Sequence, residues 1–230
     1  MSVCTGQYRQ TRQTRQTKTI SIQVKNGNIE IKAPFGLNQS YIESFIQKKE
    51  KWIKNKIDLQ KSIKEPSEKK FIEGEIFKFL GEDLVLKINI GNKKEAYIEN
   101  EFLYLTINNK DNYKEKIKKK MELFYRGSSK KILEEKTFSQ AKKMNLYPKK
   151  VKVRSYKNRW GSCAYNGDIS YNWKLIMLPE KIIDYVIVHE LCHLIHFNHS
   201  KDFWREVIKI IPNYKDSREW LRSNQYLYNW

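Results

Sequence analysis

The sequence predicts an α+β protein with a β-rich N-terminal part and a helical C-terminal part. Short runs that alternate apolar and polar residues dominate residues 19–109, and Asn-Gly or Gly-Glu turns separate several of them. This alternation is typical of half-buried strands. From residue 110 onward, apolar residues recur every three or four positions, as in amphipathic helices. We therefore expect a β-rich region over 19–109 and a helical domain over 110–230.

The composition is that of a folded protein. Of 230 residues, 40% are hydrophobic and 13% aromatic, which excludes wholesale disorder. No run of about eighteen apolar residues occurs, and the N-terminus lacks an apolar signal stretch, so no membrane association is expected. Three cysteines are few and odd in number, which argues against a disulfide framework. We expect a cytoplasmic protein, and the composition says nothing about its oligomeric state.

Positive charge is concentrated in one part of the chain. The formal net charge is +19, and residues 110–159 hold eighteen Lys and Arg against five Asp and Glu, which is +13. A charge of this size attracts polyanions such as nucleic acid. A solvated basic face without such a role explains the same composition equally well.

The N-terminal residues predict a tail followed by a hairpin. Residues 1–18 contain three consecutive Arg-Gln-Thr units, a period that fits neither strand nor helix, so a basic flexible tail is expected. Residues 19–33 alternate apolar and polar side chains on both sides of Asn26-Gly27, which is a strong hairpin signal.

One helix and a second group of strands are expected next. Ser40 and Glu43 fit a capping box that begins a helix running to about residue 62. After a linker at 65–67, several short antiparallel strands are expected at 75–80, 84–90, 96–99 and 102–107.

The sequence of residues 110–230 predicts mainly helices. A long helix over about 111–144 has an apolar stripe of Ile117, Met121, Phe124, Ile132 and Phe138. Two strands are expected at 151–154 and 168–171, with the Arg159–Cys163 loop between them. Pro179 fits the first residue of the next helix. Ser200 and Ser217 fit the caps of the last two helices, whose aromatic residues we expect to support the helix before them.

All four histidines lie between residues 189 and 199. On a helix, His189 and His193 are one turn apart on the same face and can bind one metal ion together. Glu190 follows the first histidine, where a carboxylate can take a proton from a metal-bound water and return it. This H-E-x-x-H arrangement is typical of zinc-dependent hydrolases. Four buried, hydrogen-bonded core histidines are the alternative interpretation.

The third ligand is either His196 or His199. A straight helix places His196 about 10 Å along the axis from His189, which is far for one ion. His199 follows Asn198, a residue that tolerates the left-handed conformation in which helices often end, so the chain can fold back there. We favour His199, which leaves one coordination position open for water. Cys192 points away from the ligand face and is expected to be buried.

Several of these segments together resemble the YgjP-like metallopeptidase family, in the zincin-like class. They are Arg159–Cys163, Asp184–Leu194, Asn198–Ser200 and Phe203-Trp204. The resemblance implies Zn²⁺ held by His189, His193 and His199, with Glu190 as general base and a peptide or protein substrate. The same motifs are similar to those of SprT-like and Wss-like proteases, which act on DNA-attached proteins, so DNA-associated proteolysis is a hypothesis by analogy.

The expected reaction is peptide hydrolysis, and two other functions stay open. Arg159 offers a bidentate fork, so it is a candidate contact for the oxyanion or for a substrate carboxylate, with a structural ion pair as the alternative. The basic charge also fits a metal-dependent nucleoside triphosphate pyrophosphohydrolase, although histidines suit zinc better than magnesium. A DNA-associated protein with a structural metal is the third interpretation.

Overall fold

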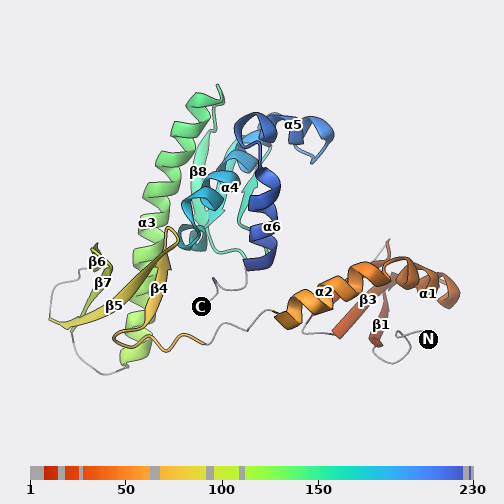
Figure 1. Cartoon of the computed structure of the whole chain (residues 1–230), viewed down its shortest axis with the longest axis horizontal. Helices are drawn as coiled ribbons and strands as arrows, with labels where there is room; N and C mark the ends of the chain where they lie inside the picture. The colour runs from red at the N-terminus through yellow and green to blue at the C-terminus, as the bar shows by residue number, and fades with distance from the viewer. Residues whose placement is uncertain are drawn as a thin grey trace. The chain divides into compact units, whose positions relative to one another are not determined.

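The computed structural model describes residues 8–14, 19–25, 28–62, 68–91, 96–108, 112–224 and 228. The chain forms two compact units, 1–65 and 66–230 (Figure 1). Strands are most frequent in the first half and helices in the second, which confirms the α+β prediction. Within the described residues, no helix is long and apolar enough to cross a membrane.

The first unit contains a three-stranded sheet with the order β1-β3-β2. Strands β2 (Ser21–Lys25) and β3 (Asn28–Pro34) form the predicted antiparallel hairpin, whose Asn26-Gly27 turn lies outside the described residues. Strand β1 (Tyr8–Thr14) pairs with β3 in parallel, although we expected a tail here. Backbone groups make this pairing, so it does not require alternating apolar side chains.

Two helices cover the apolar face of this sheet. Helices α1 (Gln39–Lys48) and α2 (Glu50–Ser62) occupy the predicted helical segment, with a break at Lys49. The cap of α1 is Asn38, whose side chain accepts a hydrogen bond from the Ser40 backbone, so the expected Ser40 cap was wrong. The buried side chains of this small core are Ile29, Ile31, Ala33, Ile42, Ile46 and Ile53.

A four-stranded sheet begins the second unit, in the order β4-β5-β7-β6. Its strands are β4 (Ile76–Phe79), β5 (Glu82–Ile90), β6 (Ala96–Glu99) and β7 (Phe102–Ile107). Strands β5 and β7 pair in parallel, so the expectation of antiparallel strands fails for this pair. Leu86 and Leu103 of this sheet share a core with Ile117, so the sheet packs against the helical region. The boundary between the two units is therefore at residue 65, whereas we expected one near residue 109.

Helix α3 (Tyr113–Lys143) runs along the whole second unit (Figure 1). Its buried face recurs at every fourth residue: Ile117, Met121, Tyr125, Ser129, Leu133, Thr137 and Ala141. Of the predicted stripe, Ile117 and Met121 lie on this face, Phe124 and Ile132 are partly buried and pack against the same core, and Phe138 is 43% exposed, so only Phe138 was wrongly assigned. Small polar residues are accepted on the buried face because their hydroxyls find acceptors, as Ser129 Oγ does at the Trp173 carbonyl, 2.5 Å away.

The remaining elements surround the predicted metal helix. Strands β8 (Lys150–Arg154), β10 (Asp168–Asn172) and β9 (Gly161–Cys163) form a small sheet in that order. A 3-10 helix, η1 (Trp173–Met177), leads to α4 (Glu180–Cys192), with Pro179 as its N-cap. Helix α5 (Lys201–Ile210) is capped by Ser200, as predicted. Helix α6 (Tyr214–Asn224) begins three residues before Ser217, so that predicted cap was wrong.

Candidate metal centre

Helix α4 presents the first two histidines. His189 lies in its last turn, and His193 directly follows its last residue, Cys192. The four-residue spacing therefore places the two imidazoles one turn apart, with ring centroids 5.0 Å apart. Nine of the thirteen residues of α4 are buried, including Val188 and Glu190 on either side of His189.

The chain turns back immediately after α4. The backbone N–H groups of Ile195 and His196 both donate to the Cys192 carbonyl, at 3.1 and 3.0 Å. The chain bends again at Phe197 and Asn198, but Asn198 does not take the left-handed conformation we expected. His199 then lies next to the two helical histidines, and its Nε2 atom is 3.0 Å from His189 Nε2.

Three histidines form one cluster. Ring nitrogens of His189, His193 and His199 all lie within 4.8 Å of one another. Among the described residues, this is the one group of three or more His, Cys, Asp or Glu side chains arranged to hold a metal ion. His196 is not part of the cluster, although its backbone is used: the His196 carbonyl is 2.9 Å from His193 Nδ1. A protonated Nδ1 donates to that carbonyl, which leaves His193 Nε2 free to bind a metal.

An aromatic layer from α5 supports all three imidazoles. The Phe203 ring is fully buried, with its centroid 5.0, 4.6 and 4.8 Å from those of His189, His193 and His199. Trp204 stacks on His199 at 5.7 Å and 28°. These contacts agree with the expected supporting role of the aromatic residues in this helix.

The surroundings favour the neutral form of His189 and His199. Burial, helped by the neighbouring His193 and His199 rings, lowers the pKa of His189 to about 3. Burial and His193 also lower the pKa of His199. A neutral imidazole is the form that binds a metal ion, so neither ring must first lose a proton near neutral pH.

Glu190, the residue after His189 on α4, is buried. Its side chain is only 6% exposed, and burial raises its pKa to about 8, while the positive charge of Arg159 acts in the opposite direction. The carboxylate packs against the backbone of Gly161 in β9, where a β-carbon would be 2.6 Å from Oε1. The lack of a side chain at residue 161 therefore makes room for the Glu190 carboxylate.

The loop before β9 holds Arg159 near Glu190. The Asn172 side-chain amide donates to the carbonyls of Tyr156 and Arg159, at 3.0 and 3.4 Å, and so ties the loop to the end of β10. The Arg159 guanidinium lies 5.4 Å from the Tyr156 ring centroid and makes no ion pair with a described carboxylate. The structural ion pair considered as its alternative role is absent from the described residues.

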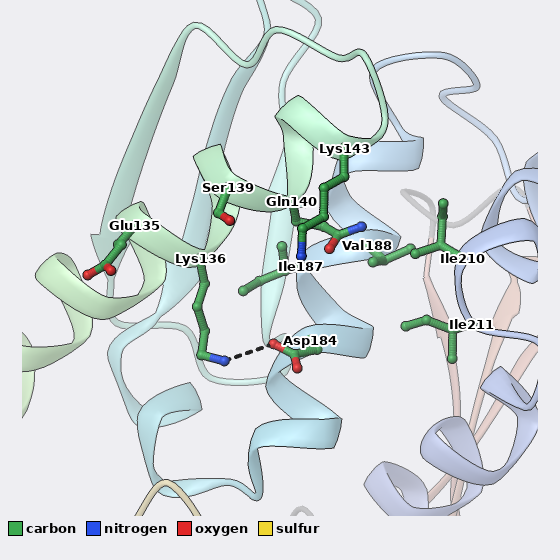
Figure 2. A pocket seen from close by; sticks show the side chains of 10 residues that line it. All are labelled: Glu135, Lys136, Ser139, Gln140, Lys143, Asp184, Ile187, Val188, Ile210 and Ile211. Carbon is green, nitrogen blue, oxygen red and sulfur yellow. Dashed lines mark hydrogen bonds and ion pairs between the residues drawn. The ribbon is translucent and has the colours of Figure 1, made fainter.

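A separate cavity lies on the other side of α4. It has a volume of about 410 Å³ and lies between α3, α4 and the end of α5 (Figure 2). From α4 it is lined by Asp184, Ile187 and Val188, which point away from the histidine face because successive helical residues are rotated by about 100°. Lys136 binds Asp184 at 3.1 Å at its edge. The cavity is therefore distinct from the metal centre.

The chain that carries this histidine cluster matches a known protein family. The model of the YgjP-like metallopeptidase domain matches residues 18–224. The chain belongs to this YgjP-like family. It is accordingly a metal-dependent peptidase, and the family match concerns peptide hydrolysis and gives no support to nucleic-acid binding.

The chain was also compared with solved structures and with curated proteins. Among solved structures, the metallopeptidase zymogen of Pyrococcus abyssi abylysin is similar at 25% identity, over 40% of this chain and 95% of that chain, with a TM-score of 0.37. A comparison with curated proteins gives no match.

Sequence reasoning missed three contributors to this YgjP-like site. Gly161 was noted only as part of a family segment, and its role depends on the packing of β9 against α4. His196 was considered as a ligand, whereas its backbone carbonyl orients His193. Arg218 of α6, whose charge reaches His189 and His199, has no local sequence signal.

Proposed function

We propose that the protein is a zinc-dependent metallopeptidase in which Glu190 is the general base. The observation that carries the proposal is the convergence of three histidine nitrogens within 4.8 Å, with the buried Glu190 directly after the first of them on α4. Three protein ligands leave a coordination position open, which is typical of catalytic zinc sites.

The residues present fit a zinc ion. The donor set is three imidazoles, and the Nε2 atoms of two of them are 3.0 Å apart. Imidazole nitrogen is a better ligand for zinc than for magnesium or calcium, which prefer oxygen ligands. His189, His193 and His199 would hold the ion. When bound, zinc supplies a Lewis acid that polarises the peptide carbonyl and lowers the pKa of water.

Glu190 performs the proton transfers. Its buried carboxylate takes a proton from the attacking water and delivers it to the nitrogen of the departing amine. The buried position also keeps bulk water from competing for that proton.

Strand β9 is a candidate binding edge for the peptide. Among the described strands, β9 pairs only with β10, so its other edge has unpaired backbone groups. An extended peptide can pair with such an edge through main-chain hydrogen bonds. Because Gly161 of β9 contacts Glu190, a peptide bound there would pass close to the carboxylate.

Arg159 is the proposed polar contact for the reacting group. Its exposed guanidinium lies near enough to lower the pKa of Glu190 and has no described carboxylate partner. It can therefore donate to the oxyanion or to a substrate carboxylate.

Cleavage of an unfolded, fluorescently quenched protein by the zinc-loaded chain tests the proposal. Glu190→Gln should keep one zinc per chain and lose at least about 100-fold in kcat. Glu180→Gln is the matched control, because Glu180 begins the same helix and pairs with Lys136 at the surface. Wild-type rates in Glu190→Gln would refute the proposed mechanism.

A further inference from the structure

Helix α6 places an arginine beside the metal centre. The guanidinium carbon of Arg218 lies 5.1 Å from the centroid of the Trp204 ring. The same ring stacks on His199 at 5.7 Å and is 5.9 Å from the His189 ring. The Arg218 guanidinium carbon and the centroid of the His199 imidazole are thus both less than 6 Å from the centroid of the Trp204 ring.

The Arg218 side chain is exposed and has no acidic partner in the part of the chain that the structure describes. Its neighbours on α5 and α6 are paired, since Arg205 binds Asp202 at 3.0 Å and Arg222 binds Glu219 at 3.5 Å. No described carboxylate forms an ion pair with Arg218.

Aromatic packing restricts the position of this guanidinium. Tyr214, one turn before Arg218 on α6, is buried and stacks on Trp204 at 4.8 Å and 21°. An arginine held against an aromatic ring keeps its N–H groups available in a fixed plane. Those N–H groups match the two oxygens of a carboxylate.

We propose that Arg218 binds a carboxylate of the peptide substrate and so determines specificity. This inference rests on the proposed peptidase function. The Arg218 guanidinium carbon and the His199 ring centroid lie 5.1 and 5.7 Å from the Trp204 centroid, so they are at most about 11 Å apart. An extended peptide spans roughly 3.3 Å per residue, so a carboxylate about three residues from the cleaved bond can cover that distance. The carboxylate belongs either to an Asp or Glu side chain or to the C-terminus of the peptide.

Cleavage of a synthetic peptide library, sequenced by mass spectrometry, distinguishes the two sources. The library is prepared with free and with amidated C-termini and is treated with zinc-loaded wild type, Arg218→Gln, Arg218→Glu and Arg222→Gln. Arg222→Gln is the matched control, because Arg222 lies one turn further along α6 and is already paired with Glu219.

Wild type should favour Asp or Glu at one position, or should cut at a fixed distance from a free C-terminus. Amidation removes the preference only in the second case. Arg218→Gln should abolish the preference and raise KM roughly 10- to 100-fold with kcat little changed, since one charge-assisted contact is lost. Arg218→Glu should favour Lys or Arg at the same position, and Arg222→Gln should behave as wild type.

Binding without turnover gives a second readout. A fluorescent peptide of the preferred sequence should bind the zinc-loaded Glu190→Gln protein roughly 10-fold or more tightly than the Glu190→Gln, Arg218→Gln double variant. An unchanged cleavage profile and KM in Arg218→Gln would overturn the role of Arg218 alone. Failure of wild type to cleave any peptide would instead refute the proposed function, and this inference with it.

Discussion

Gly161 of β9 and Glu190 of α4 are in such close contact that a β-carbon on residue 161 would lie 2.6 Å from the Glu190 Oε1 atom and 2.8 Å from its carboxyl carbon. The backbone of Gly161 is not in the left-handed region, so alanine is compatible with its conformation. The glycine is therefore required by the space that the carboxylate occupies.

Gly161→Ala should displace the carboxylate and leave the three histidines in place. We expect a loss of roughly 100-fold in kcat, because a displacement of about 1 Å of a catalytic group costs this much, with zinc content unchanged. Peptide cleavage and elemental analysis on the same preparation measure both. Gly127→Ala in α3 is the control, since a β-carbon there meets nothing within 4 Å. Full activity of Gly161→Ala would show that the contact does not position Glu190.

Ser217 lies inside the first turn of α6 and does not cap it. Its side chain is 1% exposed, and its hydroxyl has no hydrogen-bond partner within the described residues. Ser217→Ala should leave the free energy of unfolding unchanged or raise it, because removing an unsatisfied buried hydroxyl recovers its desolvation cost.

Ser200→Ala is the comparison for this urea-unfolding experiment. Ser200 Oγ accepts a hydrogen bond from the Phe203 N–H at 3.3 Å, so its loss should lower stability by about 1 kcal/mol. An equal loss in Ser217→Ala would mean that Ser217 also acts as a cap.

The ion pair of Asp168 makes the stability of the small β8-β10-β9 sheet depend on pH. Its hydrogen bond and ion pair with Lys152 join β10 to β8 and lower the pKa of the Asp168 carboxyl. A pKa that is lower in the folded than in the unfolded protein means that the stabilisation is present at neutral pH and is lost as the pH falls through the folded pKa.

The difference in Tm between wild type and Asp168→Asn should therefore be largest near pH 7 and should shrink on acidification. Lys152→Gln removes the partner and should give the same pH dependence in a thermal scan. A Tm difference that is constant from pH 7 down to pH 3 would contradict the role of this ion pair.

Local rules were sufficient for the elements whose contacts lie close in sequence. The hairpin of β2 and β3, the helix that presents His189 and His193, and the Ser200 cap each follow from a spacing of a few residues. The sequence also indicated that the chain folds back near Asn198, and a bend is present at Phe197 and Asn198. The left-handed conformation expected at Asn198 is absent, and backbone bonds to the Cys192 carbonyl make an earlier turn directly after α4.

Long-range packing decided the features that were not foreseen. The buried face of α3 follows a four-residue row through Tyr125 and Ser129, because Tyr125 and Ser129 donate to the carbonyls of Lys78 and Trp173. The parallel pairing of β5 with β7 depends on a partner strand that no local pattern specifies. Arg218 reaches the histidines only because α6 packs on Trp204.

The most direct test of the three-histidine centre is zinc content by elemental analysis of untagged wild type, His199→Ala and His196→Ala. We predict one zinc per chain in wild type, loss of zinc in His199→Ala, and retention in His196→Ala, because His196 contributes its backbone carbonyl and alanine keeps that group. A wild-type protein without stoichiometric metal after purification with zinc present, or loss of zinc in His196→Ala with retention in His199→Ala, would contradict the centre described here.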